Sequence, residues 1–340
     1  MKEFAGYRRG INLGGWLSQC IHCRKHYDSF IVESDIARIS KWGLDHIRLP
    51  IDYKLVRSAD GSFKKEGFEY IDRCLEWCGK YNLNMILDLH ETAGFSFDKK
   101  PGGFFKSPVL QDMFVSLWEE FAKRYGKYDT RLSFELLNEV VDENVADVWN
   151  CIIKRTVTAI RQYAPVSKIL VGGVRNNSVL WVRKLDAPYD ENIVYTFHFY
   201  EPLIFTHQSA YWVDKMPADF STGYPSDFNT VVRETENYLP RMHRDIYDII
   251  QTEKIDRSFI MAAFADALTA AEERDAAIYC GEYGVIDKAS LSSTLNWFSD
   301  MHSVFEEHGI GRAVWTYRGK DFGITDVHYS EILNSLLRLL

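Results

Sequence analysis

The feature of this sequence that most constrains its fold is an alternation between two kinds of segment. Short runs rich in β-branched and apolar residues alternate eight times with stretches of helical periodicity, from one end of the 340 residues to the other. This alternation is typical of parallel strand and helix units, and eight such units can close a sheet on itself. The sequence therefore predicts an α/β protein with the (β/α)8 architecture of a TIM barrel.

The expected strands are short and most of the expected helices are longer. Strands are predicted at residues 9–13, 46–49, 84–89, 132–137, 168–171, 193–199, 278–281 and 311–315. The first helix is predicted to be capped by Ser34 and to end before Gly43, because serine favours helix starts and glycine favours helix ends. The other helices are predicted at residues 66–81, 109–125, 144–163, 178–185, 258–274, 290–308 and 330–340.

One connection is much longer than the others. Residues 201–256 separate the sixth strand from its helix and contain a periodic stretch of their own at 231–250. Connections of this length are usually functional. We expect one catalytic barrel over residues 1–340, with residues 201–256 as an inserted subdomain on its catalytic rim, named the rim segment.

Charge and hydropathy exclude several classes of partner. Lys and Arg number 40 against 48 Asp and Glu, which gives a formal charge of -8, and no basic run could bind a phosphate backbone. No apolar run reaches the roughly 18 residues that span a bilayer, and the start of the chain lacks the apolar region of a secretory signal. We expect no nucleic-acid or membrane partner, a monomer, and a protein that is cytoplasmic or secreted with its leader removed.

The cysteines predict neither disulfides nor a metal centre. Six cysteines in 340 residues are too few for a disulfide framework. The run from Cys20 through His22 and Cys23 to His26 could in principle supply thiolate and imidazole ligands, but we do not expect a zinc site there. Cys74 and the cysteine four residues later share the apolar face of a predicted helix. We expect reduced structural thiols and no metal.

The ends of the predicted strands are unusually polar. In a TIM barrel the reactive groups project from the carboxyl ends of the strands. The side chains at these ends are Arg48, His90, Asn138, Glu139, His198, Tyr200, Glu282 and Trp315. We therefore expect these eight to meet at one mouth of the barrel.

Two of the eight are carboxylates on different strands, which is the minimum equipment for cleaving a glycosidic bond. One carboxyl protonates the departing oxygen and the other captures the oxocarbenium-like carbon. Arg48 would keep Glu282 ionised as the nucleophile, and Tyr200 would donate a hydrogen bond to it. Burial and nearby negative charge would raise the pKa of Glu139 and make it the acid.

Other side chains suit contacts with sugar. Asn138 could bind a sugar 2-hydroxyl, and Trp315 offers an apolar face to a ring. Further aromatic residues lie in several predicted loops and are candidates for sugar subsites: Trp16, Phe95, Phe97, Phe205, Tyr211, Trp212 and Tyr317. So wide a distribution favours a polymer, although Tyr211 and Trp212 could instead pin the rim segment to the barrel.

Seven short motifs now point to a family. RGINLGGW, HIRLP, LDLH, LLNE, FHFY, GEYG and VWTY, in this order, resemble glycoside hydrolase family 5, the cellulase family of clan A. The resemblance covers essentially the whole chain. It implies a retaining β-glycanase without a cofactor, with Glu139 as acid/base and Glu282 as nucleophile. The surrounding site implied by the resemblance is Arg48, His90, Asn138, His198, Tyr200 and Trp315.

The resemblance is strongest to bacterial endo-β-1,4-glucanases that also accept mixed-linkage glucan and carry a rim insertion after strand six. It implies a β-glucan oligosaccharide or polysaccharide as the substrate. Two positions depart from the usual pattern: Val140 stands where many relatives have proline, and Glu91 stands where many have a second histidine. Glu91 leaves open the sugar preference of the neighbouring subsite.

Three alternatives remain open at this point. One alternative is an exo-β-1,3-glucanase or a β-mannanase of the same family. The motif RGINLGGW also resembles the start of exo-β-1,3-glucanases. A second is a carbohydrate-binding barrel without catalytic activity, which would be expected to lack one carboxylate. A third is a metal-dependent barrel hydrolase that uses His90 and His198 as ligands.

Overall fold

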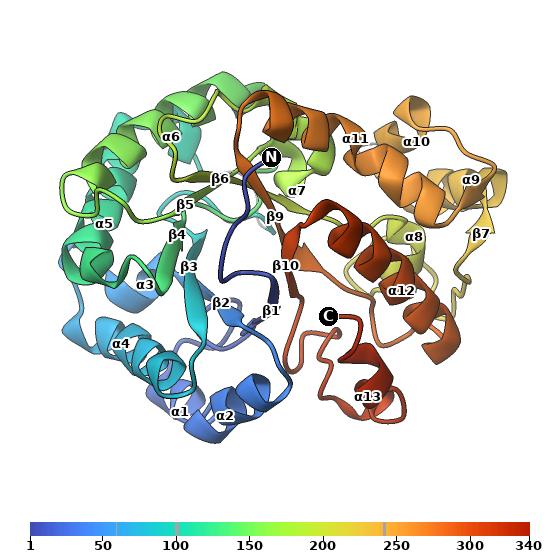
Figure 1. The fold of residues 1–340 in the computed structure, drawn as a ribbon, viewed down its shortest axis with the longest axis horizontal. Coiled ribbons are helices and arrows are strands. Elements are labelled where there is room, and N and C mark those ends of the chain that lie inside the picture. The colour runs from blue at the N-terminus through green and yellow to red at the C-terminus, as the bar shows by residue number, and fades with distance from the viewer. Residues whose placement is uncertain (59, 99–101, 241–242) are drawn as a thin grey trace.

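A computed structural model describes residues 1–58, 60–98, 102–240 and 243–340. Eight parallel strands close into a barrel in the order β1, β10, β9, β6, β5, β4, β3, β2, and helices surround it (Figure 1). The barrel strands are β1 (Arg9–Asn12), β2 (His46–Asp52), β3 (Asn84–Glu91), β4 (Leu132–Glu135), β5 (Ile169–Gly172), β6 (Ile193–His198), β9 (Ala277–Tyr283) and β10 (Gly311–Val314). The predicted TIM barrel is confirmed, and each strand overlaps its expected range.

Helices cover the outside of the barrel. The long ones are α2 (Glu33–Lys41), α4 (Lys65–Lys80), α5 (Pro108–Tyr125), α6 (Ala146–Arg161), α11 (Arg257–Glu273) and α12 (Leu291–His308). Short ones are α1 (Arg24–Tyr27), α3 (Tyr53–Val56), α7 (Val174–Asn177) and α13 (Leu333–Leu336), with 3-10 turns between them. Cys74 and Cys78 lie on the buried face of α4, as predicted, and none of the six cysteines forms a disulfide.

Three helix predictions were wrong in detail. Helix α2 begins at Glu33, because the Val32 amide donates to the Asp35 carboxylate at 3.0 Å and Ser34 is not the cap. Residues 178–185 form only a 3-10 helix, Val179–Lys184. Of residues 330–340, only the four of α13 are α-helical.

The interior of the barrel is apolar at one end and polar at the other. Phe4 and Tyr7 stack at 4.2 Å and belong to a small apolar cluster with residues of the barrel strands. His46 lies among them, bonded to Asp45 at 2.6 Å and to the Tyr279 hydroxyl at 2.7 Å. The carboxyl ends of the strands instead present buried charged side chains. The fold therefore places its polar interior at the mouth where TIM barrels carry their active sites.

The rim segment lies beside this mouth, next to α11 and α12 (Figure 1). It contains α8 (Leu203–Thr206), β7 (Ser226–Asp227), α9 (Phe228–Tyr238), α10 (Asp245–Ile249) and β8 (Lys254–Ile255). Strands β7 and β8 pair antiparallel and join the two ends of its outer part. The Tyr247 hydroxyl donates to Glu201, and the Trp297 indole donates to the Glu201 carbonyl, so the segment is tied back to the end of β6.

No helix in the described part of the chain is both long and apolar enough to cross a bilayer.

Candidate active site

The structure brings the eight predicted strand-end residues together at the carboxyl ends of the barrel strands. Arg48 projects from β2 and His90 from β3, while Asn138 and Glu139 follow β4. His198 ends β6 and Tyr200 lies two residues beyond it. Glu282 is on β9 and Trp315 follows β10.

An irregularity in β9 aims one of the carboxylates. Along β6 and β9, Phe197 pairs with Cys280, but His198 pairs with Glu282, so β9 carries one extra residue at Gly281. A bulge of this kind re-aims the next side chain. A β-carbon at Gly281 would lie 3.0 Å from the His198 ring, so glycine permits the close approach of the two strands.

Arg48 lies fully buried among three carboxylates. Its guanidinium contacts Glu135 at 2.6 Å, Glu282 at 2.7 Å and Asp88 at 3.1 Å. It also donates to Asn138 at 3.0 Å. Burial raises the pKa of Glu135 to about 7, although Arg48 opposes the rise. Charge-assisted bonds of this geometry fix the position of Arg48, and through it the position of Glu282.

Glu282 and Tyr200 form the second predicted contact. The Tyr200 hydroxyl donates to Glu282 Oε2 at 3.0 Å, while Arg48 holds Oε1. Burial raises the pKa of Tyr200 well above its ordinary value, so the hydroxyl keeps its proton. Both oxygens of Glu282 are thus held by hydrogen-bond donors.

Glu139 has different surroundings. Its backbone is left-handed, with φ of 44°, and its side chain is 13% exposed. His198 Nδ1 lies 2.8 Å from Glu139 Oε1, and Asn176 Nδ2 donates to Oε2 at 3.2 Å. Burial raises the pKa of Glu139, and the Asn176 bond partly offsets the rise. Burial also lowers the pKa of His198 to about 4, so the imidazole beside Glu139 is neutral at neutral pH.

The two carboxylates lie close together. One oxygen of Glu139, one oxygen of Glu282 and a ring nitrogen of His198 lie within 4.8 Å of one another. These three are the one group with metal-ligand spacing among the described residues. The run from Cys20 to His26 forms no such group there, since His22 bonds to Tyr27 and Asp52, and His26 bonds to the Gly15 carbonyl.

His90 and Trp315 form one wall. Their rings stack at 5.7 Å with an angle of 4° between the planes. Burial would lower the pKa of His90, but Asp88, 2.7 Å from Nδ1, outweighs it and the pKa is raised. Asn138 Nδ2 is buried and has no partner in the described part of the chain, so it can donate to a bound hydroxyl.

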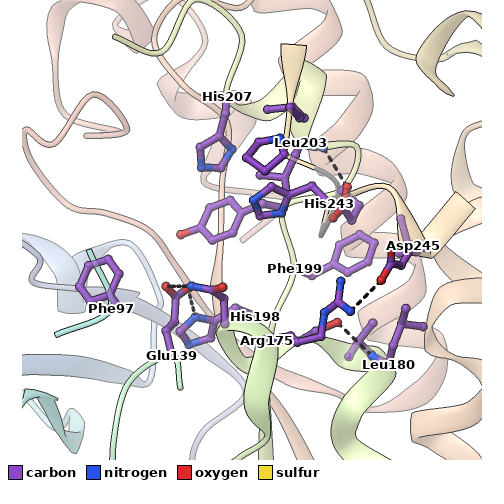
Figure 2. A pocket seen from close by; sticks show the side chains of 18 of the residues that line it. Phe97, Glu139, Arg175, Leu180, His198, Phe199, Leu203, His207, His243 and Asp245 are labelled. Carbon is purple, nitrogen blue, oxygen red and sulfur yellow. Dashed lines mark hydrogen bonds and ion pairs between the residues drawn. The ribbon is translucent and has the colours of Figure 1, made fainter. Parts of the chain in front are cut away.

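A cavity of about 910 Å³ opens beside Glu139 (Figure 2). Its walls include Glu139, His198 and Tyr200 from the strand ends, together with Trp212 and other residues of the rim segment. Glu282, His90 and Trp315 are not in its walls. Of the two carboxylates, Glu139 therefore lies in the wall of this cavity and Glu282 does not.

The predicted subsite aromatics divide into two groups. Trp16 is fully buried: its indole donates to the Tyr27 carbonyl and its ring stacks on Trp77 at 6.2 Å. Phe205 is also fully buried, and Phe95 packs at 5.7 Å against another phenylalanine outside the cavity. These predictions were wrong for Trp16 and Phe205, and also for Tyr317, which is fully buried. Trp212, at 44% exposed, does line the cavity.

Several cavity residues escaped the sequence analysis. His207 and His243 line the cavity, and neither was among the candidate site residues predicted from the sequence. Asn176, which contacts Glu139, was missed because it follows a strand whose end carried no acidic residue. The signal available was the pair of asparagines after β5, since asparagine tolerates left-handed backbone better than most residues.

The two residues that depart from the usual motif pattern, Glu91 and Val140, are both buried. Glu91 is buried and accepts a bond from Ser96 at 2.6 Å. Val140 is buried, and its carbonyl accepts the Asn176 amide at 3.0 Å.

Comparison with known proteins shows what this chain is similar to. It is 42% identical to Cellodextrinase A of Ruminococcus flavefaciens, over 92% of this chain and 86% of that protein. It is 38% identical to Endoglucanase C of Acetivibrio thermocellus, over 98% of both.

Solved structures share the fold. Cel5A of Thermotoga maritima in complex with cellobiose has a TM-score of 0.75 at 22% identity, over 97% of each chain. The cellulose synthase subunit Z of Clostridioides difficile has a TM-score of 0.76 at 24% identity, over 97% of this chain and 99% of that one. The family model described as Cellulase (glycosyl hydrolase family 5) matches residues 10–321. The match spans nearly the whole barrel, and this chain belongs to glycosyl hydrolase family 5, the cellulase family.

Proposed function

We propose that this chain hydrolyses internal bonds of β-1,4-glucan or mixed β-1,3/1,4-glucan by double displacement, with Glu139 as acid/base and Glu282 as nucleophile. The observation that carries the assignment is the 4.8 Å limit on the distance between oxygens of these two carboxylates. Retaining enzymes hold their carboxyl groups about 5 to 5.5 Å apart, whereas inverting enzymes need about 6.5 to 9.5 Å to admit a water.

The surroundings of each carboxylate support its role. Arg48 and Tyr200 donate to the two oxygens of Glu282 and so fix its position for attack on the anomeric carbon. Glu139 lies beside a neutral imidazole, and burial raises its pKa, which favours the protonated form that an acid needs. In the second step the same carboxylate accepts a proton from water, which then releases the sugar from Glu282.

The position of the cavity indicates which part of the substrate each side of the cleft would hold. Because Glu139 protonates the leaving group, the cavity on its side would hold the departing part of the chain. Trp315 and His90, on the side of Glu282, would hold the sugar that is attacked, and Asn138 Nδ2 would bind its 2-hydroxyl. We propose that residues 201–256 act as an inserted wall over the departing part.

The relatives support a glucan substrate, since two of them are named an endoglucanase and a cellodextrinase. A binding barrel without activity is not supported, because the chain is a glycoside hydrolase with both carboxylates present.

Metal-dependent hydrolysis is not favoured by the charges. His198 is the histidine in the group with metal-ligand spacing, and Glu282 already pairs with Arg48 in that group. We propose that the protein acts as a monomer and needs no metal.

The test is hydrolysis of lichenan, a soluble cellulose derivative, laminarin and mannan by the purified protein, with viscosity and reducing ends followed together. Endo action on glucan predicts that viscosity falls before many reducing ends appear, with and without a chelator. Release of single glucose units from laminarin without loss of viscosity would favour the exo-β-1,3-glucanase alternative. Preferential hydrolysis of mannan would favour the β-mannanase alternative. Loss of activity with the chelator would favour a metal-dependent hydrolase.

A further inference from the structure

The turn that follows β5 has an unusual backbone. Arg175, Asn176 and Asn177 have consecutive φ values of 56°, 58° and 53°. Left-handed backbone is disfavoured for residues that have a β-carbon, and it normally occurs at single positions. Strained segments of this kind persist only where the surrounding structure fixes them, and they cluster at functional sites.

The turn is hydrogen-bonded to the segment that carries Glu139. The Asn176 amide donates to the carbonyl of Val140, the next residue after Glu139, at 3.0 Å. The Asn176 side chain donates to Glu139 Oε2 at 3.2 Å. One asparagine thus holds both the backbone after Glu139 and one of its two oxygens, while His198 contacts the other oxygen.

Arg175 connects the same turn to two outer segments. Its guanidinium pairs with Glu143, in the loop before α6, at 2.8 Å and with Asp245, the first residue of α10, at 2.7 Å. Arg175 is 15% exposed, so these pairs are partly shielded from solvent. Figure 2 shows Glu139 and His198 at one side of the cavity and the Arg175 pair with Asp245 at the other.

We propose that the turn Arg175–Asn177 is a positioning element for acid catalysis, in which Asn176 orients the Glu139 carboxyl and the Arg175 pair with Asp245 couples that orientation to the rim segment. This inference rests on the proposed role of Glu139 as the acid. With Oε2 held by Asn176, the carboxyl group cannot rotate freely, and the position of its proton relative to the departing oxygen is fixed. A movement of α10 would reach Glu139 through two adjacent residues.

The first test replaces Asn176 by glycine, which keeps the left-handed backbone accessible and removes the amide. The expected loss in kcat/KM on a cello-oligosaccharide is about tenfold, because small errors in placing a catalytic group are costly. On dinitrophenyl β-cellobioside, whose leaving group needs no proton, kcat/KM should stay within about twofold. Asn82→Gly is the matched control, since Asn82 is also left-handed, with φ of 56°, and lies before β3 at the far end of the barrel.

The pH profile gives a second readout that a merely structural role would not change. The groups whose charges act on Glu139 are Arg48, Asp88 and His90, with His198 and Glu282 in its immediate surroundings. The Asn176 bond lowers the pKa of Glu139, so Asn176→Gly should move the basic limb to higher pH. Equal losses on both substrates with an unmoved basic limb would overturn the proposal.

The second test addresses the coupling to the rim segment. Asp245→Asn should lower kcat/KM on the oligosaccharide about two- to fivefold, the range of a partly exposed ion pair, and spare the activated substrate. Asp266→Asn is the control, because Asp266 pairs with Arg183 at 2.6 Å on the outside of the barrel. If Asp245→Asn matched this control, the coupling would be refuted.

Glu139→Ala separates failure of this inference from failure of the proposed function. If that variant kept its activity on the oligosaccharide, Glu139 would not be the acid and the proposed function would fail. If it lost activity while Asn176→Gly behaved like Asn82→Gly, only the positioning role of Asn176 would fail.

Discussion

Glu139 and Glu282 are the same kind of side chain in one cleft, and their neighbours make them chemically different. Glu282 accepts bonds from Arg48 at 2.7 Å and Tyr200 at 3.0 Å. Glu139 is contacted by a neutral imidazole and by an amide instead. Two carboxyls with different surroundings in one cleft are the usual basis of acid and nucleophile assignments.

These roles predict opposite products when azide replaces the missing group. In Glu282→Gly, azide should attack an activated β-glycoside directly and give the α-glycosyl azide. In Glu139→Ala, azide should intercept the covalent intermediate and give the β-glycosyl azide. The anomeric configuration of each azide product is measured by NMR. A β-azide from Glu282→Gly with an α-azide from Glu139→Ala would show that the two roles are exchanged.

The raised pKa of Glu139 predicts the alkaline side of the pH profile. The acid must be protonated in the free enzyme, so activity should fall as pH rises through its pKa, and burial moves that limb above the ordinary range of a glutamate. The dependence of kcat/KM on pH should therefore be bell-shaped. In the unmodified protein the basic limb should be pronounced on a cello-oligosaccharide and weak on dinitrophenyl β-cellobioside, whose leaving group needs no proton. An equal limb on both substrates would assign it to another group.

At the scale of single elements, strands were easier to predict than caps and short helices. The eight barrel strands are buried and rich in apolar residues, so their pattern survives the tertiary context. Ser34 was expected to cap α2, but Asp35 takes the Val32 amide instead. The left-handed turn Arg175–Asn177, just before the helix expected at residues 178–185, was not predicted, because left-handed backbone leaves no periodicity to detect.

Aromatic residues mark the limit of prediction for the site. Sequence alone placed Trp16 and Phe205 in loops near the cleft, but it could not show that packing against the barrel buries both completely. Trp212 has the same chemistry and is 44% exposed at the cavity. The clustering of the candidate site residues was predictable because strand ends converge, whereas exposure within a long loop depends on contacts that no local pattern records.

This contrast predicts opposite phenotypes for two tryptophans. Trp16→Ala should destabilise the fold by about 3 to 5 kcal/mol, because it empties a buried site. Trp212→Ala should lower kcat/KM on polymeric glucan with little change in Tm, because its ring contributes contact area to the cavity wall. Thermal unfolding and polymer kinetics on both variants test this. A large fall in Tm for Trp212→Ala would show that it only pins the rim segment to the barrel.

At the scale of the whole molecule, the fold separates stability from chemistry. The apolar cluster around Phe4 and Tyr7 fills one end of the barrel, and the buried charges around Arg48 occupy the other. The rim segment adds a wall on the side of Glu139 without interrupting the order of the barrel strands. The rim segment can therefore vary with the substrate while the residues at the strand ends stay unchanged.

The central claim is that Glu282 forms a covalent bond to the sugar, and trapping that bond tests it most directly. A dinitrophenyl cellobioside with fluorine at the 2-position slows both steps, and its activated leaving group lets the first step proceed. Mass spectrometry should show one sugar bound per chain and, after digestion, place it on Glu282. A label on Glu139, or no label in a protein that hydrolyses glucan with inversion, would contradict the account.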